Sequence, residues 1–256
     1  SCGQVLPRKE VRDLSQSEWD AYVTAVKRIM DSGEYARYVA IHNDNRQTIH
    51  YNAIFLVWHR AMLFMYEQAL NSGGSGSIRI PYWDEGYDSQ APALSDVLSD
   101  AYYGSNGSGS KMCVQDGAFA DWAPPVPGDG CITRRYDNGK SITAFHGVEQ
   151  MEALISSAES YADLVELLTP LHDTVHNNVG GLMRNVGNSP GDPLFYAHHA
   201  YYDKMFYDWT QAHPDVGLQV NGEDIKGNPV NAGHRLPPWD ITAGDVMDTR
   251  NLCYTY

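Results

Sequence analysis

The stretch that decides the fold is residues 168–211, LTPLHDTVHNNVGGLMRNVGNSPGDPLFYAHHAYYDKMFYDWTQ. His172 and His176 are four residues apart, so a helix would place both imidazoles on one face, where they can bind one metal ion. A connection rich in glycine and proline follows, and a second, aromatic-rich helix then carries His198 and His199. A histidine pair alone is also common in cores and on surfaces. The further histidine favours a three-nitrogen site for zinc, copper, iron or nickel.

A second candidate group lies upstream, at His42, His50 and His59. Nine residues of ideal helix would turn His50 and His59 to opposite faces, so a helix must begin between them if both bind one metal. His50 would then lie on the preceding loop. Carboxylates are sparse near both groups, which disfavours a di-iron carboxylate centre. Six imidazoles for two metals instead suggest copper.

The rest of the chain predicts a mainly α fold. Ser15 and Glu18 form a capping-box pattern at the start of the first helix. Helices are expected at residues 18–30, 34–41, 55–70, 149–157 and 161–168, with two more carrying the downstream histidines, the last ending near residue 211. Residues 78–84 look extended, and residues 85–140 form a long loop. We therefore expect one domain, residues 1–256, with a four-helix bundle core around a dicopper site, long loops and few short strands.

Composition limits the classes of partner. The net charge of −14 argues against nucleic acid and against an anionic membrane surface. No run of about 18 apolar residues exists, so no transmembrane span is expected. Oligomeric state is left open.

The four cysteines (Cys2, Cys113, Cys131 and Cys253) include no close pair, so disulfides in a secreted protein fit better than a thiolate metal site. A Cys113–Cys131 bond would hold part of the long loop, and Asn106 begins a glycosylation sequon.

Two stretches carry a recognisable motif, residues 50–67 (HYNAIFLVWHRAMLFMYE) and residues 192–203 (DPLFYAHHAYYD). They resemble the copper-binding signatures of the type-3 copper proteins, which are tyrosinases, catechol oxidases and molluscan-type hemocyanins. Periodicity leaves His198 and His199 as alternatives, and the family motif selects His199. Residues 81–84 (PYWD) and 254–256 (YTY) are also similar to family segments. In the family the tyrosine motif packs near an N-terminal arginine, here Arg8 or Arg12, which would make a Cys2–Cys253 disulfide plausible.

The resemblance implies two copper ions, with O2 as co-substrate and small phenols as substrates. His42, His50 and His59 would hold the first copper, and His172, His176 and His199 the second. The implied activity is oxidation of o-diphenols to o-quinones with reduction of O2 to water. The resemblance does not decide whether monophenols are hydroxylated as well. An o-aminophenol oxidase and a hemocyanin-like O2 carrier are the alternatives. The C-terminal shielding domain of latent family members is not expected in this chain, so the site should be open. The compact size resembles that of the short secreted fungal polyphenol oxidases.

The resemblance also assigns residues around the metals. Asp173 and Asn177, which follow two second-site histidines, would orient or deprotonate the substrate, and Val186 would be the gate residue. The sequence departs from the family at two places. Thr48 stands near His50 where many members have a cysteine, so no thioether bond is expected. No acidic residue stands where some members orient a water, and Glu166 or Asp163 are the remaining candidates.

Overall fold

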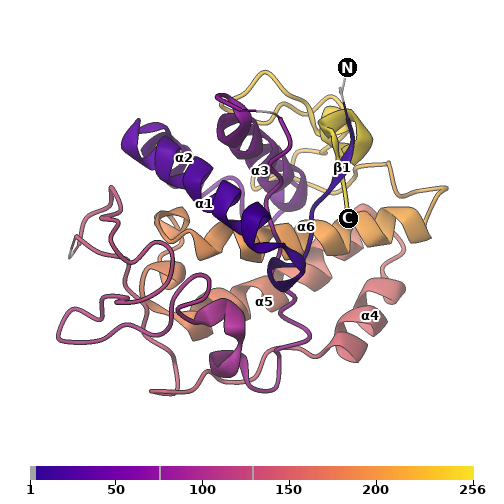
Figure 1. Cartoon of the computed structure of the whole chain (residues 1–256). Coiled ribbons are helices and arrows are strands. Elements are labelled where there is room, and N and C mark those ends of the chain that lie inside the picture. Colours follow the sequence, from indigo (N-terminus) through magenta and orange to yellow (C-terminus); the bar gives the residue numbers. More distant parts are fainter. Residues whose placement is uncertain (1–3, 75, 129) are drawn as a thin grey trace.

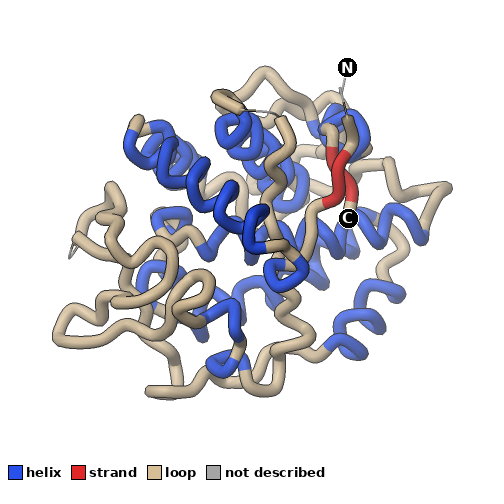
Figure 2. Tube along the Cα trace, in the orientation of Figure 1, coloured by secondary structure: helices blue, strands red, loops and turns tan. Residues whose placement is uncertain are grey.

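Four helices form the core of the molecule. The computed structural model describes residues 4–74, 76–128 and 130–256. The core helices are α2 (Glu34–Asn45), α3 (Phe55–Asn71), α5 (Tyr161–Val179) and α6 (Leu194–Ala212). In Figure 1, α6 crosses the middle of the molecule, and both α3 and α5 pack against it. Helices and loops dominate the trace in Figure 2, which confirms the predicted mainly α class.

The other elements cover this core. Helix α1 (Gln16–Asp31) packs on α2 and α3, and its capping box between Ser15 and Glu18 is present as predicted. The remaining helices are α4 (Val148–Ser157), α7 (Ala243–Met247) and the 3-10 turns η1 (Val11–Asp13), η2 (Pro92–Leu94), η3 (Asp96–Leu98), η4 (Gly181–Arg184), η5 (Ser189–Gly191) and η6 (Thr249–Leu252). Within the described ranges, none of the helices combines the length and apolar character needed to cross a bilayer.

Two helices run further than the sequence predicts. Helix α2 continues to Asn45, and the Arg46 guanidinium donates to the Asn43 carbonyl at 2.7 Å, so polar side chains that suggested a loop instead satisfy the helix end. Helix α5 passes through Pro170 without a break. Proline there removes one backbone hydrogen bond. A buried stripe that includes Leu168 and Leu171 offsets this loss by packing on the core.

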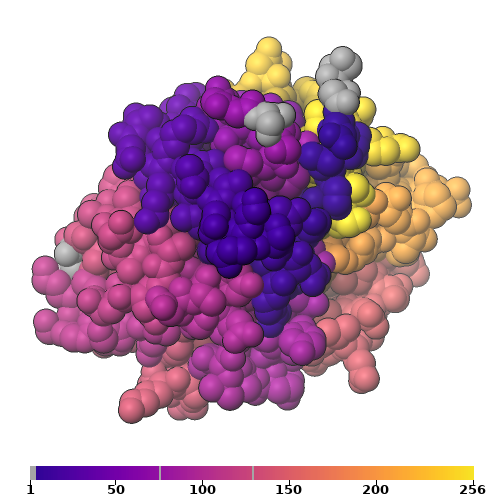
Figure 3. All heavy atoms as spheres, viewed as in Figure 1, coloured from indigo at the N-terminus to yellow at the C-terminus, as the bar shows by residue number. Residues whose placement is uncertain are grey.

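The long loop of residues 85–140 fixes the start of α6. The predicted Cys113–Cys131 disulfide closes part of it. The buried Arg134 guanidinium donates to both carboxylate oxygens of Asp192 at 2.8 Å. Asp192 in turn accepts a hydrogen bond from the backbone N–H of Leu194, the first residue of α6. The loop forms one continuous magenta-to-pink part of the surface in Figure 3, and this ion pair anchors it to the helix that carries His198 and His199.

The two ends of the described chain lie side by side. Strand β1 (Leu6–Pro7) pairs in parallel with β2 (Tyr254–Thr255). The arginine that meets the tyrosine motif is Arg8, whose guanidinium carbon lies 3.6 Å from the centre of the Tyr254 ring. Arg12 instead pairs with Glu10 and Asp88. The proposed Cys2–Cys253 bond involves Cys2, which lies outside the described residues.

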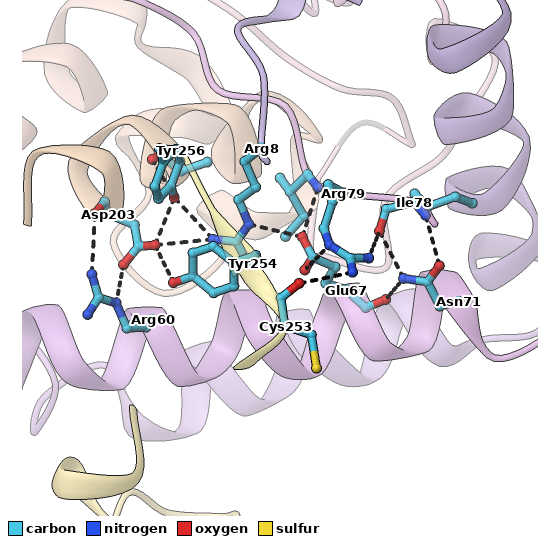
Figure 4. Close-up of polar contacts among 12 residues, drawn as sticks. Arg8, Arg60, Glu67, Asn71, Ile78, Arg79, Asp203, Cys253, Tyr254 and Tyr256 are labelled. Atoms are coloured by element: carbon cyan, nitrogen blue, oxygen red, sulfur yellow. Dashed lines mark hydrogen bonds and ion pairs between the residues drawn. The ribbon is translucent and has the colours of Figure 1, made fainter. Parts of the chain in front are cut away.

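A buried ionic network links these ends to α3 and α6 (Figure 4). Asp203 of α6 accepts from Arg60 of α3 at 2.5 Å and from Arg8 at 3.2 Å. The hydroxyls of Tyr254 and Tyr256 donate to the same carboxylate. Because Asp203 follows His199 by four residues and Arg60 follows His59 directly, the network holds α3 and α6 in register next to the histidines.

Candidate metal centre

The structure gathers the predicted histidines into two groups. His42 comes from the last turn of α2, His50 from the loop before α3, and His59 from the first turns of α3. The second group holds His172 and His176 of α5 with His198 and His199 of α6. Within each group the candidate ligand atoms lie within 4.8 Å of one another. The loop position predicted for His50 is therefore observed, and the second group contains one histidine more than the predicted triad.

Hydrogen bonds fix the orientation of most of these rings. The Nδ1 atoms of His42, His50 and His59 contact the carbonyl oxygens of Gly187, Arg46 and Phe55 at 2.8–2.9 Å. His176 Nδ1 contacts the Met183 carbonyl, and His172 Nδ1 contacts the Asp173 carboxylate. A carbonyl oxygen can only accept, so Nδ1 carries the proton and Nε2 keeps its lone pair. Such contacts are typical of histidines that bind metals through Nε2.

The free nitrogens face one another. His172 Nε2 lies 2.9 Å from His176 Nε2 and 3.1 Å from His199 Nε2, while His59 Nε2 lies 3.4 Å from His42 Nε2. For nitrogens about 2.0–2.1 Å from a metal, tetrahedral neighbours would be about 3.3 Å apart. The rings of His59 and His199 stack at 4.4 Å between centroids, so the two groups meet at this pair.

Burial keeps these imidazoles neutral. The pKa of His42 falls from 6.5 to about 3, first because its ring is buried and then because His50 lies beside it. Burial also places the pKa values of His59, His172, His176 and His199 well below 6.5, with neighbouring imidazoles adding to the effect. The pKa of His50 is lowered for the same first reason. Neutral imidazole is the form that binds metals.

We expect the copper-free protein to lose stability as the pH falls below about 6.5. The folded pKa of His42 lies below its unfolded value, so the unfolded chain binds more protons in this range. Between pH 6.5 and pH 5, His42 alone should cost about 2 kcal/mol at about 1.36 kcal/mol per pH unit. Urea unfolding at the two pH values measures this loss. It should shrink in His42→Asn, and equal stability at both pH values would contradict it.

A small cavity opens over the histidines. It has a volume of about 40 Å³, and the candidate ligands His50, His172 and His176 contribute to its wall. The predicted residues Asp173, Asn177 and Val186 also line it. Val186 is 51% exposed, at the mouth of the cavity. Burial raises the pKa of Asp173, and a hydrogen bond with Tyr51 partly offsets the rise.

Sequence reasoning missed a buried pair beside the second group. His198 Nδ1 lies 2.5 Å from Glu85 Oε1, and both side chains are almost fully buried. His198 Nε2 and Glu85 Oε2 have no hydrogen-bond partner among the described residues. Burial raises the pKa of Glu85, and the contact with His198 opposes the rise. Glu85 directly follows the PYWD segment, which was the one signal that could have drawn attention to it.

The two acidic residues suggested for orienting a water lie elsewhere. Asp163 is exposed in the first turn of α5 and accepts from the backbone N–H of Glu159. Glu166 is exposed and lines a neighbouring groove. Neither of them lines the small cavity. Thr48, at the place of the thioether cysteine, donates its hydroxyl to the Asn45 carbonyl.

Comparison with known proteins gives one consistent family. Residues 32–212 match the family model described as the common central domain of tyrosinase. A tyrosinase of Streptomyces glaucescens is 30% identical over 94% of this chain and 95% of its own length. A tyrosinase of Aspergillus flavus is 29% identical over the whole chain and 80% of its own length.

Solved structures share the fold. A variant of polyphenol oxidase from Thermothelomyces thermophila superposes with a TM-score of 0.71 at 22% identity, covering 98% of this chain and 88% of the other. A functional unit of octopus hemocyanin gives a TM-score of 0.66 at 20% identity over 98% of this chain and 68% of its own. The matched segment spans both histidine groups and all four core helices. The chain therefore belongs to the tyrosinase family of type-3 copper proteins.

Proposed function

We propose that this chain is a copper-dependent oxidase that converts o-diphenols to o-quinones and reduces O2 to water. The observation that carries the proposal is the pair of facing histidine groups beneath a cavity that opens to solvent. His42, His50 and His59 would hold one copper ion, and His172, His176 and His199 the other. A bound copper pair would supply the electron transfer, in which two catechols give four electrons and four protons to one O2.

The residues present fit copper by their chemistry. Each group offers neutral imidazole nitrogens, without the cysteine thiolates of structural zinc sites or the oxygen-rich ligand sets of magnesium and calcium. Their Nδ1 contacts leave the Nε2 lone pairs free, and within each group Nε2 atoms approach one another. The cost of ordering these rings is met during folding, before any metal binds.

The cavity residues would orient the phenol. The Asp173 carboxylate accepts a hydrogen bond from His172 Nδ1, and this bond orients His172 as a copper ligand. Asp173 also lines the cavity. The Asp173 carboxylate would accept a substrate proton directly or through a water. Asn177 would donate an amide hydrogen bond to the substrate or that water, and Val186 would leave room for the ring at the entrance. The Glu85–His198 pair is a further candidate for holding a water behind the second site.

Two rival functions use the same histidines. An o-aminophenol oxidase would need the same cavity. Its substrate carries an amino nitrogen where an o-diphenol carries its second hydroxyl oxygen. A hemocyanin-like carrier would need the site protected from phenols. The exposed Val186 and Tyr51 at the mouth favour access by a substrate over closure. We extend the proposal to one catalytic domain over residues 1–256 and to a secreted glycoprotein, since the Cys113–Cys131 disulfide suits an oxidising compartment.

Oxygen uptake by the copper-loaded protein tests the proposal. We expect uptake with 4-methylcatechol, because the cavity opens directly to the metal ligands. Adding 4-methylphenol separately distinguishes a diphenol oxidase from an enzyme that also hydroxylates monophenols. For the second case, Asp173→Asn should reduce monophenol turnover by about 10²-fold or more while affecting catechol oxidation less. Reversible O2 binding without uptake on either substrate would contradict the oxidase and support the carrier.

A further inference from the structure

A large groove lies next to the cavity over the histidines. It has a volume of about 480 Å³, and Tyr51 and Asp173 line both spaces. We propose that this groove binds the ring substituent of the phenol and prefers a substituent that ends in an ammonium group. The inference rests on the proposed phenol oxidation, and it names the class of substrate that the site would take.

The groove is a fixed feature of the fold. One wall is a single face of α5, formed by Ala162, Val165, Glu166, Thr169, Pro170 and Asp173. The opposite side is the loop of residues 51–53 and the turn at Gly222 and Glu223. The Ala53 N–H donates to the Glu223 carbonyl at 3.0 Å, and the Tyr161 hydroxyl donates to the Ala53 carbonyl at 2.6 Å. Three segments are therefore tied together around one space.

The position of the groove relative to the metal site sets the length of the substituent. Helix α5 carries both His172 and the groove wall, so the groove runs along this helix away from the ligands. Glu166 precedes His172 by six residues, which is about 9 Å along the helix axis. A phenol that directs its oxygen at the metals can direct its para substituent along this path. A tether of two or three carbons would bring its end near the Glu166 carboxylate.

Tyr51 forms the corner between the two spaces. Its backbone φ of 60° lies in the left-handed region that residues other than glycine rarely adopt. Such strain persists where the surrounding structure requires it, often at functional sites. The side chain is 65% exposed although its ring centroid lies 6.2 Å from that of His50. An aromatic face at this corner can pack against the ring of a phenol whose substituent enters the groove.

The charge of the groove selects the substituent. The residues that line it include three acidic ones, Glu166, Asp173 and Glu223, and among the described lining residues there is no lysine or arginine. The other lining groups are mostly apolar, such as Ala162 and Val165, which suits a hydrocarbon tether. Arg184 lies instead on the wall of the small cavity. An ammonium group therefore finds favourable charge in the groove, whereas a carboxylate would be repelled there and attracted toward Arg184.

Three catechols that differ in the charge of one substituent test this inference. They are 4-(2-aminoethyl)catechol, 4-propylcatechol and 3-(3,4-dihydroxyphenyl)propionate, compared by KM with the copper-loaded protein at low salt. Exposed ion pairs are individually weak, so we expect KM for the amine to be about three- to tenfold lower than for the propyl compound. The propionate should have the highest KM. Added salt should reduce the differences, because Glu166 and Glu223 are exposed to solvent.

A binding measurement without turnover separates this inference from the proposed function. Phenethylamine and 3-phenylpropionate carry no phenolic hydroxyl, and their dissociation constants can be measured by NMR titration of the copper-loaded protein. The amine should bind more tightly by a similar factor. The double variant Glu166→Gln/Glu223→Gln should lose this preference, while Glu152→Gln, an exposed carboxylate on α4 outside the groove, should keep it.

The outcomes are distinct. Oxidation of 4-propylcatechol without any preference for the amine would overturn the groove assignment and leave the oxidase intact. A lower KM for the propionate would overturn it too, and would place the substituent toward Arg184. If no catechol is oxidised, the proposed function fails, and the NMR comparison still decides whether the groove selects cations.

Discussion

Replacing His199 with alanine is expected to reduce bound copper from about two ions per chain to about one and to lower catechol oxidation by more than about 100-fold. Removing a residue that hydrogen-bonds to a metal ligand typically lowers metal affinity or activity by about 10- to 100-fold. Removing the ligand itself should lower them more. His199 Nε2 lies 3.1 Å from His172 Nε2, and its ring stacks on His59. His199 therefore lies where the two histidine groups meet. Metal analysis and oxygen uptake measure both effects.

The neighbouring histidine provides the matched control. His198→Gln keeps a side-chain donor for the buried Glu85 carboxylate and should retain both copper ions. His213→Ala, which changes a histidine outside both groups, should behave like the unaltered protein in both assays. If His199→Ala kept two copper ions and His198→Gln lost one, the assignment would be reversed. His198, and not His199, would then be the third ligand of the second copper.

The second large effect is expected from Asp203→Asn, which should reduce the free energy of unfolding by about 3–5 kcal/mol. The carboxylate is buried with two guanidinium groups, those of Arg8 and Arg60. Burial alone would raise the pKa of Asp203, but these two charges and the Tyr254 hydroxyl lower it below its usual value. An amide cannot neutralise them, so a positive charge would remain buried without a full counter-charge. Urea unfolding of the copper-free proteins measures the change.

An exposed ion pair on the same helix shows what a solvated contact contributes. Lys204 Nζ lies 2.6 Å from the Asp208 carboxylate, four residues further along α6. Asp208→Asn should therefore change stability by only about 0.3–0.5 kcal/mol. If Asp203→Asn were as mild as this control, the buried network would not be what holds α3 and α6 in register.

Local signals explain which elements were predictable. Helices α1 and α3 end within two residues of their predicted limits, because a capping box starts one and a Ser/Gly-rich segment follows the other. The end of α2 was missed because its last residues are polar and cap the helix with their side chains. The histidines fell into the predicted groups since their spacing on helices leaves few alternatives. The family motif, and not periodicity, was needed to distinguish His199 from His198.

Long-range contacts could not be read from the sequence. Glu85 and His198 are separated by 113 residues and meet only because the extended PYWD segment runs against α6. The groove is built from a loop, a helix face and a distant turn, none of which suggests a binding space alone. Asp173, Asn177 and Val186 were assigned from the family resemblance, and all three line the small cavity.

The most direct test of a dicopper centre is the copper content of the purified chain after loading and removal of loosely bound metal. We expect two copper ions per chain, since two groups of neutral imidazoles are already oriented by backbone contacts. A ratio of one would show that the two groups do not form separate sites, and a ratio near zero would contradict the metal centre itself.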